Sequence, residues 1–207
     1  ESFFYENIYK SKKKIKVSTA SEVTINFFPT TGMNKITNLE IENTYQNIMY
    51  DVLKSSYVSN ILECINYGIE SSFNLYKILK ISLTAINNGV NEKLVCCHFF
   101  MQILKDHGFI FKYQKTDYEY VGYSFLRNSF VDKSNIDYSL FGINDNLVKL
   151  TYYISIKNID FLEGLDLSNK DLIKLFSFFN ILFKEYIGIE TKSYKKIIDL
   201  EEMLSSK

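Results

Sequence analysis

The spacing of apolar and polar side chains changes early in this chain of 207 residues. Residues 2–28 are rich in β-branched and aromatic side chains that alternate in part with polar ones, as in "KIKVSTASEVTINFF". Alternation at every second position predicts strands, and two or three strands fit here. Because a lone hairpin is marginally stable in water, these strands need either the rest of a small barrel or a helical surface to pack against.

The segment 29–38, "PTTGMNKITN", separates two kinds of pattern. It contains the single Pro of the chain together with a Gly, and we interpret it as a linker because both residues favour turns. Over residues 39–69 apolar side chains recur at steps of three, four and five residues, which predicts a helical face. The apolar positions of this segment are Ile41, Tyr45, Ile48, Val52, Tyr57, Ile61 and Ile65.

Further helical patterns follow, interrupted by one segment without a regular period. That segment, 109–146, is polar and aromatic, and its length of more than 30 residues predicts local structure or a function rather than a bare loop. In a later helix, Ser168 is suited to be the N-cap, with Asp171 three residues on, and Gly188 to end the helix. The predicted helices span residues 73–87, 92–107, 147–162, 168–187 and 194–204.

These patterns predict a mainly α fold, with a helical bundle domain at 39–207 preceded by a short β segment at 1–28. Composition agrees, because 46% hydrophobic residues suffice for a core and one Pro with eight Gly favours long helices. The abundance of Tyr and Phe resembles a genome-wide bias, so single aromatic residues carry little weight. The chain begins with Glu1 rather than Met, and we expect a fragment or a trimmed product.

Charge and cysteine content limit which binding partners and which cellular compartment we expect for the protein. The 24 basic and 24 acidic residues cancel, so any electrostatic binding of nucleic acid or membrane depends on local patches. Three cysteines without a C-x-x-C spacing form neither a disulfide framework nor a zinc clip, which favours a reducing compartment and hence the cytoplasm. No apolar run approaches the roughly 18 residues that span a bilayer, and no signal-peptide pattern opens the chain.

The stretch "VCCHFFMQILKDHGF" at 95–109 holds both histidines and two of the three cysteines. Neighbouring helical residues point about 100° apart, so Cys96 and Cys97 cannot easily share one tetrahedral metal ion, and Cys97 does not face His98 as a nucleophile faces its base. His107 falls in the last turn, where a cation suits the helix dipole, and we interpret it as a capping histidine. We interpret the cysteines as core residues and expect no catalytic residue, metal ion or cofactor.

Two basic clusters hold the candidate DNA-binding residues. The first lies in "YKSKKKIKV" and the second in "GIETKSYKKI". A phosphate-binding hairpin tip with aromatic side chains close by is a combination that single-strand binders use; a solvated turn or an ordinary exposed loop is the alternative interpretation. The lysines concerned are Lys10, Lys12, Lys13, Lys14 and Lys16 in the first cluster, and Lys192, Lys195 and Lys196 in the second.

Glu63 is a single carboxylate within the apolar run "SNILECINYGI". A buried carboxylate costs several kcal/mol unless it is paired, so we expect a structural partner or exposure at the edge of the helix. The sequence has no glycine-rich phosphate loop, H-E-x-x-H or G-x-S-x-G motif, which disfavours enzyme activity. An enzyme would require a pocket in the segment 109–146 that contains carboxylates or tyrosines with perturbed pKa values.

Four short motifs follow one another along nearly the whole chain. They are "IYKSKKKIKVSTASEV", Leu62-Glu63 in "ILECI", residues 104–109 as a helix end of the form LL-x-x-x-G-[YF], and residues 186–197 as a closing G-x-x-x-K-S region. In this order they resemble the bacterial RecO family of recombination mediator proteins. The resemblance implies an N-terminal OB-fold, with the first motif forming its last strands, followed by a helical domain.

The resemblance also implies a function in DNA repair without enzyme activity. It implies binding of single-stranded and double-stranded DNA, annealing of complementary strands, and loading of recombinase together with RecR onto strands coated by single-strand-binding protein. It further implies a pocket in the helical domain for the acidic C-terminal tail of that coating protein. The alternative from another class is a non-catalytic helical protein-interaction module that does not bind DNA.

The sequence departs from the family pattern at three places. Many members carry a four-cysteine zinc site after the G-[YF] helix end, whereas the following segment here has no Cys, so a zinc site is not carried over. Against the family pattern, we expect the first part of the OB-fold to be missing from these 207 residues. At the family's K-S-R position the sequence reads Lys192-Ser193-Tyr194, and the positive charge is displaced to Lys195 and Lys196.

Overall fold

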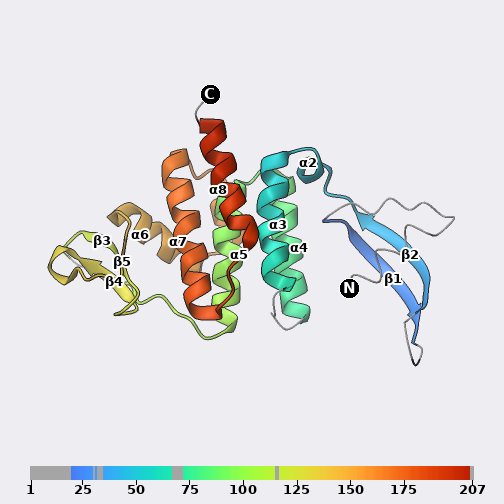
Figure 1. Ribbon diagram of the computed structural model, residues 1–207, viewed down its shortest axis with the longest axis horizontal. Helices are drawn as coiled ribbons and strands as arrows, with labels where there is room; N and C mark the ends of the chain where they lie inside the picture. Colours follow the sequence, from blue (N-terminus) through green and yellow to red (C-terminus); the bar gives the residue numbers. More distant parts are fainter. Residues whose placement is uncertain (1–19, 30, 32–34, 67–71, 115–116, 206–207) are drawn as a thin grey trace.

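The computed structural model describes residues 20–29, 31, 35–66, 72–114 and 117–205. Its elements form three parts along the long axis of the molecule (Figure 1). A bundle of helices lies in the middle, a two-stranded hairpin lies on the right of this view, and a small three-stranded sheet lies on the left. The predicted fold class, mainly α with a short β segment ahead of the helices, is confirmed.

The hairpin consists of the antiparallel strands β1 (Glu22–Phe28) and β2 (Lys35–Asn43). β1 lies where strands were predicted, but β2 reaches into the predicted linker at 29–38 and replaces the start of the helical segment predicted from residue 39. That helical prediction is therefore wrong for its first residues. The division of the chain into domains at the predicted bounds stays a prediction.

Pairing across the hairpin explains why β2 is a strand. Leu39 lies opposite Ile25, and Ile41 lies opposite Val23. These apolar pairs stabilise a strand, and a short apolar run fits helical and strand spacing almost equally well. Pairing with β1 makes this run a strand rather than a helix, and its spacing alone does not show that such a partner is present.

The bundle is built around α5, the most deeply buried helix. Its side chains are buried nearly all round, and it packs against α3, α4, α6 and α7. Within the described residues, no helix is long and apolar enough to span a membrane. The helices are α2 (Gln46–Met49), α3 (Val52–Asn66), α4 (Phe73–Asn87), α5 (Glu92–Asp106), α6 (Asp145–Ile156), η2 (Ile159–Leu162), α7 (Asn169–Ile187) and α8 (Lys192–Ser205).

Local capping fixes the bounds of the longer helices. The Ser168 hydroxyl accepts a hydrogen bond from the backbone N–H of Asp171 and so begins α7, as predicted. Gly188, with φ of 77°, adopts the left-handed conformation that ends α7, also as predicted. Gly108 follows α5 with φ of 83°. These ends were readable from sequence because each depends on residues within one turn.

The segment 109–146 contains the local structure that its length predicted. It forms the antiparallel sheet β4-β3-β5 and the short helix η1, and Phe178, in the middle of α7, packs against this segment through aromatic contacts. Phe111 stacks on Phe130 with ring centroids 5.3 Å apart and on Phe178 at 6.2 Å. The elements are β3 (Tyr120–Ser124), β4 (Ser129–Asp132), η1 (Lys133–Asn135) and β5 (Leu140–Gly142).

Candidate functional site

The second basic cluster lies at the start of α8. Lys192, Lys195 and Lys196 are all exposed, and their spacing of three and four residues places them on one side of the helix. The first cluster lies outside the described residues; it comprises Lys10, Lys12, Lys13, Lys14 and Lys16. The role of both clusters in DNA binding stays a prediction.

Glu63 on α3 is the partner of the N-terminus of α8. Its carboxylate accepts hydrogen bonds from the backbone N–H of Lys192 at 2.8 Å and of Ser193 at 2.8 Å, and from the Ser193 hydroxyl. A carboxylate in this position satisfies free backbone donors and suits the positive end of the helix dipole. The structural partner that the sequence predicted for Glu63 is therefore confirmed.

This contact limits how α8 could bind phosphate. The first backbone donors of a helix are a ready anion site, but here Glu63 already occupies those of Lys192 and Ser193. Any phosphate near this helix end would meet the side chains of Lys192, Lys195 and Lys196 instead. Binding would then be mainly electrostatic and sensitive to salt.

A buried ionic network holds the C-terminal half of α8 to the bundle. The Lys93 ammonium lies 2.7 Å from a Glu201 carboxylate oxygen, and both side chains are 4% exposed. The Tyr57 hydroxyl donates to the same oxygen at 2.9 Å, and the Asn169 amide donates to the other oxygen at 3.3 Å. Paired and hydrogen-bonded in this way, the buried charges position α8 against α3 and α5.

The cysteines and histidines are core or capping residues. Cys64, Cys96 and Cys97 are free and buried, and burial raises the pKa of the Cys64 thiol to about 12. Burial likewise lowers the pKa of His98 to about 4, which keeps its ring neutral. The described residues contain no group of three or more His, Cys, Asp or Glu placed to hold a metal ion, so they do not fit the zinc site of the resembled family.

His107 is the residue that ends α5. Its ring nitrogen Nδ1 lies 3.0 Å from the carbonyl oxygen of Ile103, and its backbone N–H also donates to that carbonyl. The capping role that the sequence predicted for this histidine is therefore confirmed. It occupies the C-cap position of the helix.

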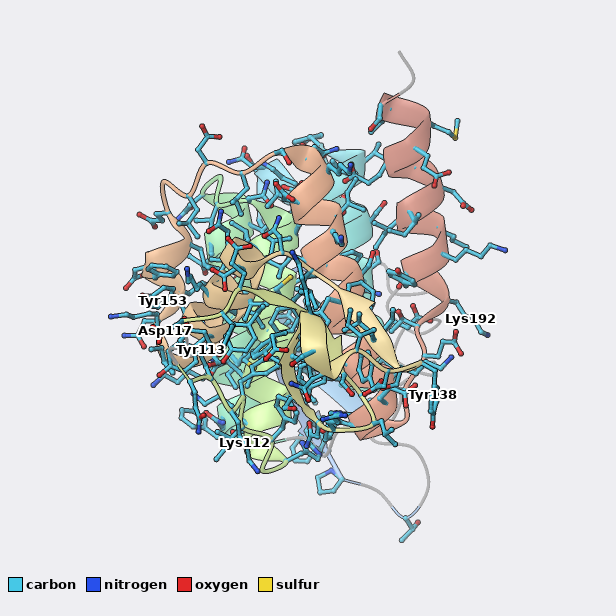
Figure 2. All side chains as sticks on the ribbon, turned by 90° about the vertical axis from the view of Figure 1, so that its left-hand side faces the viewer. Lys112, Tyr113, Asp117, Tyr138, Tyr153 and Lys192 are labelled. Atoms are coloured by element: carbon cyan, nitrogen blue, oxygen red, sulfur yellow. The ribbon has the colours of Figure 1, made fainter. Side chains whose placement is uncertain are left out.

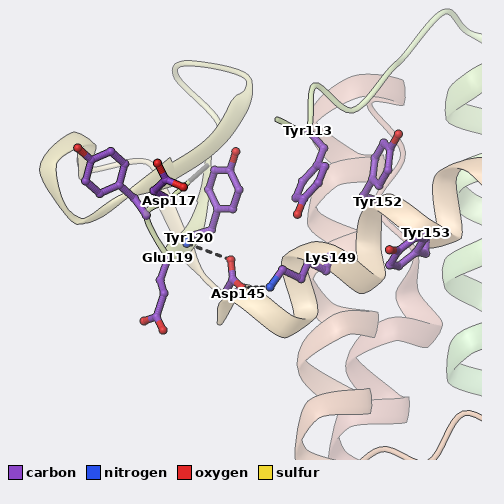
Figure 3. A pocket seen from close by; sticks show the side chains of 9 residues that line it. Tyr113, Asp117, Glu119, Tyr120, Asp145, Lys149, Tyr152 and Tyr153 are labelled. Carbon is purple, nitrogen blue, oxygen red and sulfur yellow. Dashed lines mark hydrogen bonds and ion pairs between the residues drawn. The ribbon is translucent and has the colours of Figure 1, made fainter. Parts of the chain in front are cut away.

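A pocket that sequence reasoning missed lies between α6 and the segment that leads into β3. Its volume is about 450 Å³, in the range of small ligand sites. We call it the tyrosine pocket. Figure 3 shows its side chains, and Figure 2 places Tyr113, Asp117 and Tyr153 together on one side of this end of the molecule, away from Lys192. The pocket is lined by Tyr113, Asp117, Tyr118, Glu119, Tyr120, Asp145, Lys149, Tyr152 and Tyr153.

Aromatic rings form a continuous wall of the tyrosine pocket. Tyr113 from the segment before β3 stacks on Tyr152 of α6, with ring centroids 4.7 Å apart and an interplanar angle of 22°. Tyr120 lies 5.8 Å from Tyr113, and Tyr153 lies 6.0 Å from Tyr152. The row of four rings therefore joins two elements that are separate in the sequence.

Charged groups line the rest of the pocket. The Lys149 ammonium lies 2.5 Å from Asp145, one turn earlier on α6, and the backbone N–H of Tyr120 donates to Asp145 at 3.3 Å. The hydrogen bond from Lys149 lowers the pKa of Asp145, so this carboxylate stays ionised. A carboxylate with a lowered pKa is poorly suited to general acid-base work, which needs a pKa near the working pH. Asp145 is therefore not a candidate general acid or base.

The signal for this pocket was present in the sequence. Residues 117–120, "DYEY", alternate acidic residues with tyrosines after Tyr113, and α6 carries the pair Tyr152-Tyr153. These tyrosines carried little weight because aromatic residues are frequent throughout the chain. What the sequence lacked was the packing of the two segments against each other.

Comparisons with known proteins identify relatives of one kind. The chain is 24% identical over 185 residues to a protein from Staphylococcus haemolyticus named DNA repair protein RecO, which covers 83% of this chain and 74% of that protein. It is 21% identical over 176 residues to a protein of the same name from Macrococcus caseolyticus, covering 79% and 70%. A third such protein, from Staphylococcus epidermidis, is 22% identical over 185 residues.

Other comparisons add no further relatives. No family model matches the chain, and no solved structure matches it significantly. The relatives nonetheless agree in name and in the share of the chain that they cover. The resemblance predicted from the motifs is therefore confirmed: over about 80% of its length the chain is similar to proteins named DNA repair protein RecO.

Proposed function

We propose that this protein acts in DNA repair as a non-enzymatic, DNA-binding recombination mediator. The observation that carries the proposal is its similarity, over 83% of the chain, to a protein named DNA repair protein RecO. In this role it binds single-stranded and double-stranded DNA, anneals strands, and loads recombinase in the cytoplasm. Its partners are RecR and the C-terminal tail of single-strand-binding protein.

The hairpin supports a DNA-binding role through its exposed aromatic side chains. Phe28 is 68% exposed and lies directly opposite the exposed Lys35, so both side chains are on the same face of the hairpin. An aromatic ring on which a base stacks, next to a cation that meets a phosphate, is the combination that single-strand binders use. We propose that this face belongs to an OB-fold completed by further strands.

The lysine clusters are the proposed source of affinity. Neutralising phosphates with lysines releases counterions, so contact of five lysines with a single strand would give a salt slope of about −3.5. The proposed DNA-binding residues are Lys10, Lys12, Lys13, Lys14, Lys16, Lys192, Lys195 and Lys196. Because α8 offers no free backbone donors at Lys192 and Ser193, its three lysines act through their side chains alone.

Fluorescence anisotropy with labelled single-stranded DNA at rising salt tests this function. Replacing Lys12, Lys13 and Lys14 by Glu should weaken binding strongly and flatten the salt slope. A matched control replaces Lys170 and Lys174, which are exposed on α7, by Glu and should change binding little. If the full-length protein binds no DNA even at low salt, the proposal is wrong and the non-catalytic protein-interaction module takes its place.

A further inference from the structure

The tyrosine pocket carries a net negative charge. Three carboxylates line it, from Asp117, Glu119 and Asp145, against the single ammonium of Lys149. Lys149 forms an ion pair with Asp145, so the charges of Asp117 and Glu119 remain in excess. Both of these side chains are exposed and available to a ligand. A phosphate or a carboxylate would be repelled here, which separates this pocket from the proposed DNA-binding residues.

The aromatic wall selects among cations. The faces of tyrosine rings attract a positive charge through the ring quadrupole, and a planar guanidinium also stacks on such faces. Figure 3 shows the rings of Tyr113 and Tyr152 side by side above Lys149, with Asp145 and Glu119 toward Tyr120. A guanidinium fits both features, because its flat face meets a ring while its N–H fork meets a carboxylate.

The chain itself offers no arginine for this pocket. Its one arginine, Arg127, lies in the turn between β3 and β4 and pairs with its own neighbours. Its guanidinium donates to Asn135 at 3.1 Å and lies 3.4 Å from Asp137. An arginine that enters this pocket therefore does not come from the rest of residues 1–207 of the same molecule.

We propose that the tyrosine pocket binds an arginine side chain presented by a basic segment of a partner protein. The proposal goes beyond DNA binding and adds a second surface, of opposite charge to the lysine clusters. The protein then holds DNA through its lysines and a basic protein segment through the pocket. The two ligands do not compete, because each is repelled by the surface that binds the other.

A peptide-binding experiment tests this inference. The probe is a fluorescein-labelled, end-capped peptide of four Arg-Gly repeats, compared with the same peptide carrying Lys or Gln in place of Arg. Fluorescence anisotropy should show the Arg peptide binding tightest and the Gln peptide weakest. Equal binding of the Arg and Gln peptides would overturn the proposal.

Two variants locate the binding in the pocket. Tyr152→Leu removes one ring, and the double change Asp117→Asn with Glu119→Gln removes the excess charge without touching the fold's core. Each should weaken binding of the Arg peptide about tenfold, as expected for loss of a cation-π contact in the first variant and of two exposed carboxylates in the second. If the double variant binds the Arg peptide with unchanged affinity, the peptide binds outside the tyrosine pocket and the proposal is wrong.

Matched controls separate this result from general effects. Tyr138→Leu removes a 91% exposed tyrosine that lies away from the pocket (Figure 2), and Glu163→Gln with Asp166→Asn removes two exposed acidic side chains outside it. Both controls should bind the Arg peptide like the unaltered protein. Single-stranded DNA binding should be the same in the pocket variants, so failure of the DNA-binding proposal and failure of this one are distinguishable.

Discussion

The bundle core and the N-terminal hairpin bury their apolar side chains to very different degrees. In α5, Phe99 and Phe100 are 0% exposed, and Phe100 packs on Phe183 with ring centroids 5.0 Å apart. In β1, by contrast, Phe27 is 52% exposed and Phe28 is 68% exposed. The bundle buries these rings in its own core, whereas the hairpin leaves Phe27 and Phe28 largely in contact with water.

The two regions also differ in how polar groups are used. The bundle buries an ionic network at Lys93 and Glu201 that fixes α8. The hairpin is tied to α4 through Glu22, which accepts from the Tyr76 hydroxyl at 2.5 Å and from Lys80 at 2.6 Å. Polar contacts at a partly exposed site are weak. The position of the hairpin is therefore easier to change than that of any helix in the bundle.

The largest contrast is expected from removing one aromatic ring in each region. Phe100→Ala should lower the free energy of unfolding by about 4 kcal/mol, because it leaves a cavity in a closely packed core. Phe28→Ala should change it by less than about 0.5 kcal/mol, because that ring is largely in water. Urea denaturation followed by circular dichroism measures both. Equal losses would show that the hairpin contributes to the core after all.

Acid should destabilise the bundle through His98. Its pKa is about 4 in the folded protein against an ordinary 6.5, so the folded state holds fewer protons between these values than the unfolded state. Stability from this group is therefore full above pH 6.5, falls as the pH drops, and is lower by about 3 kcal/mol at pH 4. Urea denaturation from pH 7 to pH 4 measures the slope.

The matched variant for this measurement is His98→Gln. Carboxylates also titrate over this range, so the informative quantity is the difference in pH dependence between the unaltered protein and the variant. Above pH 6.5, where His98 is neutral in both the folded and the unfolded state, the stability of the two proteins should depend on pH in the same way. An identical pH dependence in both proteins would mean that His98 is not the group that titrates.

Removing the charge of Glu63 should have a smaller effect. Glu63→Gln keeps an oxygen acceptor at the N-terminus of α8 but loses the interaction of a full negative charge with the helix end, at a cost of about 1 kcal/mol. Glu185→Gln, an exposed change on α7, is the control. Thermal melting of the two variants measures the difference, and equal melting temperatures would contradict the capping role.

The smallest effect on global stability is expected from the contact of Glu22 with Tyr76 and Lys80 on α4. Glu22→Gln should lower the free energy of unfolding by no more than about 0.5 kcal/mol, because the Lys80 side chain is 51% exposed and screened by water. Hydrogen exchange of the β1 and β2 amides should nevertheless become faster, since their local opening becomes easier. Glu42→Gln, an exposed change on β2, should leave exchange as it is.

Local signals predicted much of the bundle. The N-cap at Ser168 and the glycine end at Gly188 lie within one turn of the helix ends that they define, so they could be read directly. The predicted burial of Cys96 and Cys97 followed from the apolar run around them. In β2 the same kind of reasoning failed, because a short apolar run does not show which partner it has.

Contacts between distant segments were beyond the sequence. It showed that Glu63 needs a partner but not that the partner is the backbone of Lys192, 129 residues away. It showed tyrosines near residues 113 and 152 but not that Tyr113 and Tyr152 stack at 4.7 Å and wall a pocket. Spacing along the chain determines which face a side chain occupies; packing determines what that face meets.

By itself, the sequence determined the helical class of the fold, the bounds of α4, α5 and α7 to within a residue or two, and the resemblance that the relatives confirm. It missed the end of α6, which was predicted at residue 162 and lies at Ile156. These properties depend on residue type and short-range spacing, which the chain carries at every position. Only the tertiary structure decided that residues 35–43 form a strand, that α8 is capped by another helix, and that a tyrosine pocket exists. Each of these requires two segments to meet, and their meeting is set by the packing of the whole chain.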